Sequence, residues 1–418
     1  MRSALAAVLT SCALALVGCE RKASAPTSGG TATAPASGGT PGVTADTILL
    51  GEVGSLTGSE ATFGISTRNA IELAIKQVNA AGGVKGKKIE IRVYDNQSKP
   101  EEAAQAANRL INQDNVLLIL GEVASSNSMA MAEKAQPAKV PMISNASTNS
   151  IAMAEKAQPA HVPMITPSST NPKVTAIGDY IFRVCFIDPF QGYVMAKFAH
   201  DNLKLNKVAV LRDLGSAYSQ GLADVFERKY TEMGGKIVAR ETYTKGSTDF
   251  RSQLTAIKRA SPDAIYIPGY YNDIGLIARQ ARELGITATL MGGDGWDSEK
   301  LFELGGSAVE GSYFSNHYSP DDPNPRVQKF IASYKAAYGS VPDSLAALGY
   351  DAAMVAVDAI KRAPSFDRAA IRDAIAQTKN FHGVTGSITL DEKRNATKSA
   401  VVLQVGKGQT KYVDTIAP

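Results

Sequence analysis

Cysteine and histidine are scarce in this sequence, and their scarcity excludes several kinds of site. The 418 residues include three cysteines and four histidines. Only Cys185 lies beyond the N-terminal stretch that ends at Cys19, so no disulfide can form within the rest of the chain. Cys185 stands in an apolar, strand-like run, where a small core residue is expected. The histidines lack the spacing of metal ligands, so the sequence predicts no metal site. They are His161, His200, His317 and His382.

Two catalytic motifs and any strong charge are also absent. No G-x-S-x-G sequence offers a nucleophile to a Ser–His–Asp hydrolase. No G-x-G-x-x-G follows a predicted strand, so we expect no nucleotide cofactor. The net charge is only +4, and no run of lysine or arginine exceeds two residues, which argues against nucleic acid as a partner. We therefore expect a protein that is not an enzyme and that needs no cofactor.

The chain begins with an export signal. Ala4–Val17 is apolar but too short to span a membrane, so residues 1–18 are predicted to be a signal peptide. The run ends in Leu16-Val17-Gly18-Cys19, which resembles a bacterial lipobox, and we expect lipidation of Cys19. An ordinary signal peptide with an incidental cysteine is the alternative. Residues 19–45 are rich in Ala, Ser, Thr, Gly and Pro, which predicts a flexible tether to a membrane of the cell envelope.

Globular sequence begins near Asp46, where short apolar runs start to alternate with amphipathic stretches. Residues 48–53 predict a strand, and the i, i+4 spacing of apolar residues from Ala70 to Val78 predicts the helix after it. Such alternation indicates an α/β fold with a parallel sheet covered on both faces. The strand–helix units before Gly121 and after Pro172 are together more than one sheet usually contains, so we expect two α/β lobes. Helices are also predicted at 191–202, 248–260, 274–284, 326–338, 345–361 and 368–378.

One predicted α/β unit occurs twice in the sequence. AMAEKAQPAKVPMIS at 130–144 returns 22 residues later as AMAEKAQPAHVPMIT at 152–166, with 13 of 15 positions identical. Each copy predicts a helix, a break at proline, a short apolar strand and a turn rich in hydroxyl groups. Because the unit is repeated only once, it is a local duplication rather than a solenoid.

Polar and aromatic side chains gather after the predicted strands. In open α/β sheets, ligands bind beyond the carboxyl ends of the strands. Hydroxyl and N–H groups there suit a ligand carboxylate, and an acid beside aromatic rings suits an ammonium, so together they predict a site for an α-amino acid. Taken singly, each position is better explained by a helix cap or a turn, and it is their occurrence together after six strands that favours a ligand site. The residues are Ser55, Thr57, Phe63, Ser125, Ser126, Ser147, Thr148, Ser168, Ser169, Thr170, Tyr218, Tyr270, Tyr271 and Asp294.

Several of these segments resemble the leucine/isoleucine/valine-binding proteins, which are type I periplasmic binding proteins of ABC importers. The resemblance runs from Thr47 to the C-terminal strands. It implies two Rossmann-like lobes joined by a three-crossing hinge, with lobe 1 at 46–188 and 320–397 and lobe 2 at 189–319 and 398–418. The segments are GSLTG, NAAGGVKGKKIE, LILGEVASSNS, VPMITPSSTNP, TDFRSQLTAIKRASPDAIYIPGYYND, ARQARELGI and MGGDGWDS.

The resemblance also implies a role for particular residues. The resemblance implies that the ligand carboxylate is bound by Ser125 and by the turn Ser168-Ser169-Thr170. It implies that the ligand ammonium pairs with Asp294. The aromatic residues of the site are Phe63, Tyr218 and Tyr270.

The duplication, which lies within 125–172, departs from the family pattern. Three pairs could complete the carboxylate site: Ser125 with Thr170, Ser125 with Thr148, or Ser147 with Thr170. The first is favoured because copy two is nearer to the family pattern. About 22 residues would then loop out, at little cost in closure entropy.

The expected function follows from the export signal and the resemblance. We expect a lipid-anchored protein of the periplasm that captures a small amino acid, of the branched-chain class, and delivers it to an ABC permease of the inner membrane. A sensory module on the same fold is the alternative.

Overall fold

The computed structural model describes residues 40, 42–121, 142–143, 164–166, 172, 181–244 and 246–418. The chain divides into two units, Met1–Gly38 and Gly39–Pro418, and all the described residues lie in the second. Its helices are α1 Ala61–Ala80, α2 Pro100–Asn112, α6 Asp188–Lys197, η2 Phe198–Asn202, α7 Ala217–Glu232, α8 Arg251–Arg259, α9 Tyr271–Glu283, η3 Asp294–Trp296, α10 Glu299–Gly305, η4 Gly306–Val309, α11 Pro325–Tyr338, α12 Ser344–Arg362 and α13 Arg368–Ala376. Its strands are β1 Thr47–Gly54, β2 Lys88–Asp95, β3 Ile119–Gly121, β4 Met142–Ile143, β5 Met164–Thr166, β6 Ile181–Arg183, β7 Lys207–Asp213, β8 Lys236–Tyr243, β9 Ala264–Tyr266, β10 Thr289–Gly292, β11 Tyr313–Asn316, β12 Phe381–Gly383, β13 Gly386–Leu390, β14 Ala396–Thr397, β15 Ala400–Val405 and β16 Thr410–Ile416.

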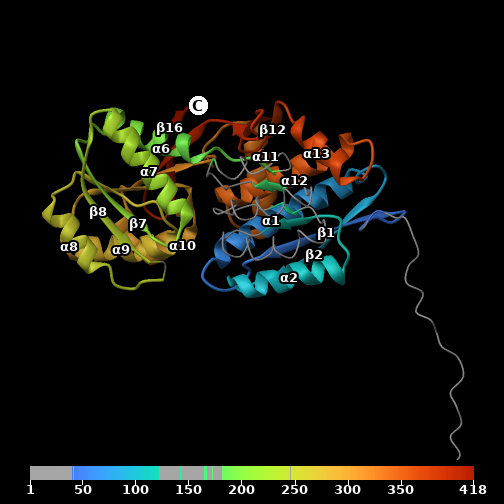
Figure 1. Ribbon diagram of the computed structural model, residues 1–418, viewed down its shortest axis with the longest axis horizontal. Coiled ribbons are helices and arrows are strands. Elements are labelled where there is room, and N and C mark those ends of the chain that lie inside the picture. The colour runs from blue at the N-terminus through green and yellow to red at the C-terminus, as the bar shows by residue number, and fades with distance from the viewer. Residues whose placement is uncertain are drawn as a thin grey trace, which may run out of the picture. The chain divides into compact units, whose positions relative to one another are not determined.

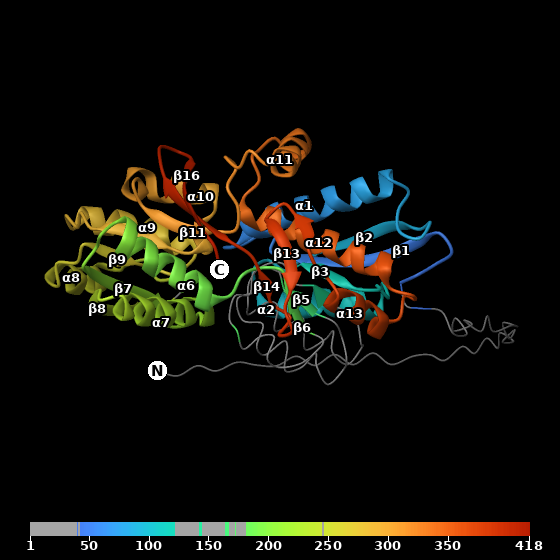
Figure 2. The same cartoon turned by 90° about the horizontal axis from the view of Figure 1, so that it is seen from above.

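The first sheet contains six parallel strands in the order β2-β1-β3-β4-β5-β6. Its core joins elements that are far apart in the sequence, because Ile48 of β1, Ile71 of α1 and Val355 of α12 belong to one buried cluster. Figures 1 and 2 show α1 beside α12, with α11 beyond them. The segment after Pro320, predicted to be helical, therefore returns to cover the first sheet.

Both copies of the duplicated unit contribute a strand to this sheet. β4 belongs to copy one and β5 to copy two, and they pair in parallel with Met142 opposite Met164 and Ile143 opposite Ile165. The expectation that one copy loops out of the fold is therefore wrong. A looped-out apolar strand would leave its side chains and its backbone hydrogen-bonding groups in water, whereas a place in the ladder pairs the backbone groups. A parallel sheet accepts one more such unit between two others because each unit has the same strand direction.

The second sheet has seven strands in the order β16-β15-β11-β10-β9-β7-β8. The strands β8, β7, β9, β10 and β11 are parallel, and β15 and β16 are antiparallel to their neighbours. Both faces are covered, because Val208 and Val210 of β7 pack in one buried cluster while Ala209 and Leu211 pack in another. The first cluster includes residues of α6 and α7, and the second includes residues of α8, α9 and α10. The two sets of helices lie on opposite sides of the sheet (Figure 1).

The predicted α/β class with two parallel sheets is confirmed. Of the six helices predicted by range between residues 191 and 378, five agree with α8, α9, α11, α12 and α13 to within a few residues. The sixth, 191–202, is the α-helix α6 continued by the π-helical turn η2. Strand β11, Tyr313–Asn316, was not predicted from the sequence.

The described chain passes between the two sheets at three places. β6 leads into α6, and β11 leads into α11. β14 leads into β15; it belongs to a third sheet of order β12-β13-β14, whose Ile388 and Ala396 pack in the core cluster of the first sheet. Helix α11 packs on the side of the first sheet, since its Phe330 shares a buried cluster with Ala70 and Leu73 of α1. We call the last two of these segments the second crossing, His317–Asn324, and the third crossing, Lys398–Ser399. Among the described residues, no helix has the length and apolar composition needed to cross a membrane.

Candidate functional site

Of the residues to which the resemblance gives a role in ligand binding, four lie in the part of the chain that the structure describes. They are Phe63, Tyr218, Tyr270 and Asp294, and all of them follow the carboxyl ends of strands. The other residues with a role implied by the resemblance or by the lipobox lie outside the described residues. These are Ser125, Ser168, Ser169 and Thr170 of the carboxylate site, and the lipidation residue Cys19.

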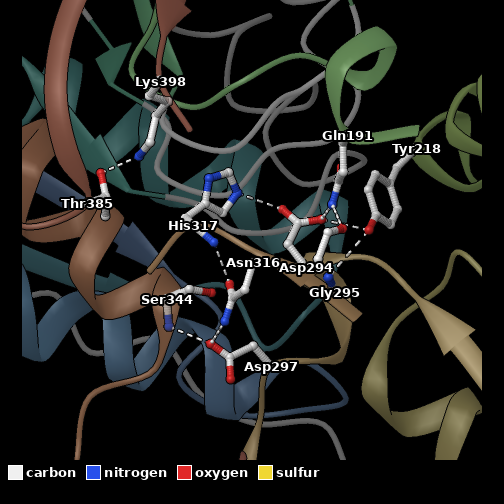
Figure 3. A network of polar contacts seen from close by, with 11 residues as sticks. Gln191, Tyr218, Asp294, Gly295, Asp297, Asn316, His317, Ser344, Thr385 and Lys398 are labelled. Atoms are coloured by element: carbon white, nitrogen blue, oxygen red, sulfur yellow. Dashed lines mark hydrogen bonds and ion pairs between the residues drawn. The ribbon is translucent and has the colours of Figure 1, made fainter. Parts of the chain in front are cut away.

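Asp294 is buried and is the centre of a hydrogen-bond network (Figure 3). Its Oδ1 accepts hydrogen bonds from the Tyr218 hydroxyl at 2.7 Å and from Gln191 Nε2 at 2.8 Å. Its Oδ2 lies 3.0 Å from Nε2 of His317, which donates because a carboxylate only accepts. Burial alone would raise the pKa of Asp294, but the hydrogen bonds from these three groups and the nearby imidazole hold the pKa below its usual value. Asp294 is therefore ionised at neutral pH.

The partners of Asp294 are themselves fixed by packing. The His317 ring stacks on Phe186, with ring centroids 3.9 Å apart and an interplanar angle of 17°. The Gln191 amide donates its second hydrogen to Ser315 Oγ at 3.0 Å. Phe186 precedes α6 and Ser315 lies in β11, so the network joins four separate segments between Phe186 and His317.

The glycines around Asp294 allow this close approach. A Cβ at Gly293 would overlap the Tyr218 hydroxyl, and a Cβ at Gly295 would overlap the carbonyl oxygen of Gly269. Gly295 also gives its backbone N–H to the Tyr218 hydroxyl at 3.4 Å. The sequence Gly-Gly-Asp-Gly therefore places the carboxylate against the tyrosine without a steric clash.

The predicted aromatic residues form one cluster of contacting rings, which we call the aromatic wall. Its members are Phe63, Tyr218, Tyr270 and Tyr271. Tyr218 and Tyr270 stack with ring centroids 5.6 Å apart, and Phe63 meets Tyr270 edge-on at 6.1 Å and Tyr271 at 4.8 Å. Phe63 belongs to α1, which covers the first sheet, whereas the tyrosines belong to the second. The Thr62 hydroxyl also bonds to the Tyr271 hydroxyl, which donates to the carbonyl of Ser59 at 3.0 Å. The wall therefore contains side chains from both sheets.

A second carboxylate lies next to the network. Asp297 Oδ2 accepts from Asn316 Nδ2 at 2.9 Å and from the backbone N–H of Ser344 at 2.7 Å. Asn316 Oδ1 in turn accepts from the backbone N–H of His317 at 2.8 Å. Ser344 is the first residue of α12, so Asp297 links the loop after β10 to a helix of the first sheet.

Two of the predicted strand-end hydroxyls have local partners instead. Ser55 donates to Asn96 Oδ1 at 3.0 Å, and Thr57 donates to Asp95 Oδ2 at 2.6 Å. Asp95 and Asn96 close β2, which pairs with β1, so the turn explanation holds for these hydroxyls.

Sequence reasoning missed Gln191 and His317. His317 directly follows β11, and a prediction of that strand would have placed the histidine among the strand-end residues. Gln191 lies inside a helix and carries no comparable signal. Within the described residues, no group of three or more His, Cys, Asp and Glu side chains could hold a metal ion.

The arrangement suits a cationic group of a small ligand. A carboxylate offers about four acceptor positions, and the described residues supply donors to three of those on Asp294, so one position has no partner among them. The faces of Tyr218 and Tyr270 add cation–π attraction.

Comparison with known proteins identifies the family of the chain. Residues 47–410 match the family model described as periplasmic binding protein. The Leu/Ile/Val-binding protein homolog 3 of Brucella melitensis is 31% identical over 348 residues, which cover 82% of this chain and 87% of that protein.

Two solved structures share the fold. The leucine-binding protein LivK of Thermotoga maritima is 42% identical with a TM-score of 0.78, and the match covers 89% of this chain and 99% of that one. The substrate-binding protein LivJ of Streptococcus pneumoniae, solved with isoleucine, is 32% identical with a TM-score of 0.78, and the match covers 89% and 100%.

Proposed function

The chain belongs to the periplasmic binding protein family, and we propose that it captures a branched-chain amino acid outside the cytoplasm and delivers it to an ABC importer permease. The observation that carries the proposal is Asp294, a buried and ionised carboxylate that has three donors among the described residues and that bonds to Tyr218, which stacks on Tyr270. Asp294 pairs with the ligand ammonium. The similarity to proteins whose names specify leucine, isoleucine and valine supports the ligand class.

The ligand carboxylate is held by loops of the first sheet in this proposal. Phe63 follows β1, and β3 is the strand next to β1, so Ser125, which follows β3 in the sequence, is proposed as one partner of the ligand carboxylate. The order of the strands indicates which residue would bind the ligand carboxylate together with Ser125. β4 is the neighbour of β3, whereas β5 is two strands away, about 9–10 Å at the usual spacing. Thr148, which follows β4, is therefore favoured over Thr170 as the second carboxylate partner.

Calorimetric titration with leucine, isoleucine and valine tests the proposal. Leucinamide, which lacks the carboxylate, and 4-methylpentanoate, which lacks the ammonium, should bind far more weakly than leucine. Asp294→Asn keeps the shape but removes the charge, and should cost about 2–5 kcal/mol, or about 30-fold to 4,000-fold in leucine affinity. If the wild type binds none of the three amino acids at millimolar concentration, the proposed ligand class is wrong.

Two further parts of the proposal concern organisation. The lobes are 46–188 with 320–397 and 189–319 with 398–418, and they close on the ligand about the crossings. Cys19 carries a lipid that holds the protein at a membrane of the cell envelope. Cys19→Ser should release the protein into the soluble periplasmic fraction, while Cys12→Ser should leave it in the membrane fraction. Equal fractionation of the two variants would remove the anchor from the proposal.

A further inference from the structure

A cavity of about 610 Å³ lies between the second and third crossings, apart from the aromatic wall around Asp294. Its size is in the range of small-molecule sites. We call it the crossing cavity. Its lining residues come from the second crossing, the turn between β12 and β13, β13, the third crossing, and the strands β14, β15 and β16; those used below are His317, Asp321, Asp322, Thr385, Lys398 and Ser399.

A buried cation lines this cavity. Lys398 is only 5% exposed, and its Nζ donates to Thr385 Oγ1. That hydroxyl donates onward to Asp351 Oδ2 at 2.7 Å, and Asp351 also accepts the backbone N–H groups of Val384 at 2.6 Å and Thr385 at 2.8 Å. Asp351 is therefore occupied, and it reaches the lysine only through the threonine.

Among the described residues, two of the three donors of Lys398 have no partner. An ammonium carries three N–H donors, and within the described residues the structure gives Lys398 one hydrogen bond and no direct carboxylate partner. Burial lowers the pKa of Lys398 to about 8, so the side chain is still charged for the most part at neutral pH. A buried charge with free donors is stabilised strongly by an anionic acceptor.

The outer part of the cavity has the opposite charge. Asp321 and Asp322 are exposed and line the same cavity. Each accepts one hydrogen bond from a backbone N–H group. Asp321 Oδ2 accepts from the N–H of Tyr412 at 3.1 Å, and Asp322 Oδ1 accepts from the N–H of Asn324 at 2.9 Å. The cavity thus has a buried positive end and an exposed negative end.

This charge order matches a small zwitterion. We propose that the crossing cavity is a second ligand site, which takes a small zwitterionic carboxylic acid with its carboxylate on Lys398 and its cationic group toward Asp321 and Asp322. The site is distinct from the proposed site at Asp294, but His317 belongs to both, because it lines the cavity and donates to Asp294. Figure 3 shows His317 between Asp294 and the pair of Lys398 and Thr385.

Titration of the purified protein with glycine, followed by NMR of ¹³C-labelled glycine, tests the site. Glycine is the smallest zwitterion of this class, and acetate is the matched probe without the cationic group. Saturating leucine in a parallel series occupies the site at Asp294, so glycine binding that persists belongs to the cavity. The glycine titration without leucine does not depend on leucine binding. If the protein does not bind leucine, that titration therefore still tests the second site.

Three variants locate the binding. Lys398→Met removes the cation and Ser399→Phe fills the cavity while keeping the lysine; each should weaken glycine binding about tenfold or more. Lys411→Met, on exposed β16, is the control and should bind as the wild type does. Thermal unfolding confirms that each variant is folded. The proposal is overturned if glycine does not saturate the wild type by about 100 mM, if either folded cavity variant binds like the wild type, or if acetate binds as tightly as glycine.

Discussion

His317 Nε2 lies 3.0 Å from Asp294 Oδ2, and both side chains are buried. The two residues follow adjacent parallel strands, β10 and β11, so the sheet sets their separation. Burial lowers the pKa of His317 despite the attraction of the carboxylate, so the imidazole is neutral at neutral pH. The pair therefore keeps a full negative charge on Asp294, which a charged imidazole would cancel. A neutral histidine positions the acid without competing with the ligand ammonium.

The first prediction concerns stability at mildly acidic pH. The pKa of His317 in the folded protein is below its usual value of about 6.5, so between these two values the unfolded chain binds more protons. Stability therefore falls as the pH drops below about 6.5. His317→Asn should lessen this fall between pH 7 and pH 5 by about 1 kcal/mol, measured by urea unfolding.

The control for this prediction is His382→Asn, since His382 is exposed. That variant should show the pH dependence of the wild type. Leucine affinity should follow the same trend in the wild type, because protonation of His317 neutralises the charge that pairs with the ammonium. Identical pH dependence in the wild type and in His317→Asn would contradict the role given to this histidine.

The difference between Asp294 and His317 shows what the sequence can predict. Asp294 was predictable because an apolar strand runs directly into Gly-Gly-Asp-Gly, a strong signal for a strand end. The strand before His317 reads Tyr-Phe-Ser-Asn, in which only Phe314 is a purely apolar side chain. Its Ser315 and Asn316 are buried because they bond to other polar side chains, which is a tertiary effect that no local pattern records.

The second prediction concerns Glu52, a buried carboxyl in β1. Burial, with a smaller contribution from Glu72, raises the pKa of Glu52 to about 8. Because the folded value lies above the unfolded one, the stability that this carboxyl contributes is fully present below about pH 4.5 and is lost as the pH rises through 8. Glu52→Gln should therefore stabilise the protein by about 1–3 kcal/mol at pH 9, with little change at pH 5.

Urea unfolding at both pH values measures this effect. Glu90→Gln is a suitable control because Glu90 lies on the neighbouring strand β2 and is exposed. A gain in stability at pH 9 that also occurs in Glu90→Gln would reflect net charge rather than burial. A Glu52→Gln variant that is destabilised at pH 9 would show that the carboxylate is needed there.

The third prediction tests whether Thr148 or Thr170, which hold equivalent positions in the two copies, is the proposed second partner of the ligand carboxylate. Thr148 follows β4, the neighbour of β3, and Thr170 follows β5. Thr148→Val should weaken leucine binding about tenfold, since a hydrogen bond to a charged group is lost, and Thr170→Val should have little effect. Each variant is the control for the other in calorimetric titration. The opposite ranking would place the ligand between β4 and β5.

The repeat itself was visible in the sequence, but its consequence was not. Near-identity of the two copies predicts the same local structure for each, and both VPMI segments do form strands. Whether a second copy extends a sheet or lies outside it depends on the neighbours that it finds. Here β5 pairs with β4 on one side and with β6 on the other, so every strand of the repeat has two partners.

The last prediction is that one copy is dispensable for folding. Deletion of residues 130–151 removes 22 residues and joins Met129 to a copy that matches the lost one at 13 of 15 positions. The pairing of Ile119 with Met142 can then be replaced by a pairing of Ile119 with Met164, because the two methionines occupy the same place in each copy. Ser125 and Thr170 would then follow neighbouring strands, so leucine affinity should stay within about threefold of the wild type or improve. Thermal unfolding and calorimetry measure both effects. A folded deletion variant that no longer binds leucine would mean that the added strand is part of the ligand site, and a deletion variant that fails to fold would mean that the sheet needs all six strands.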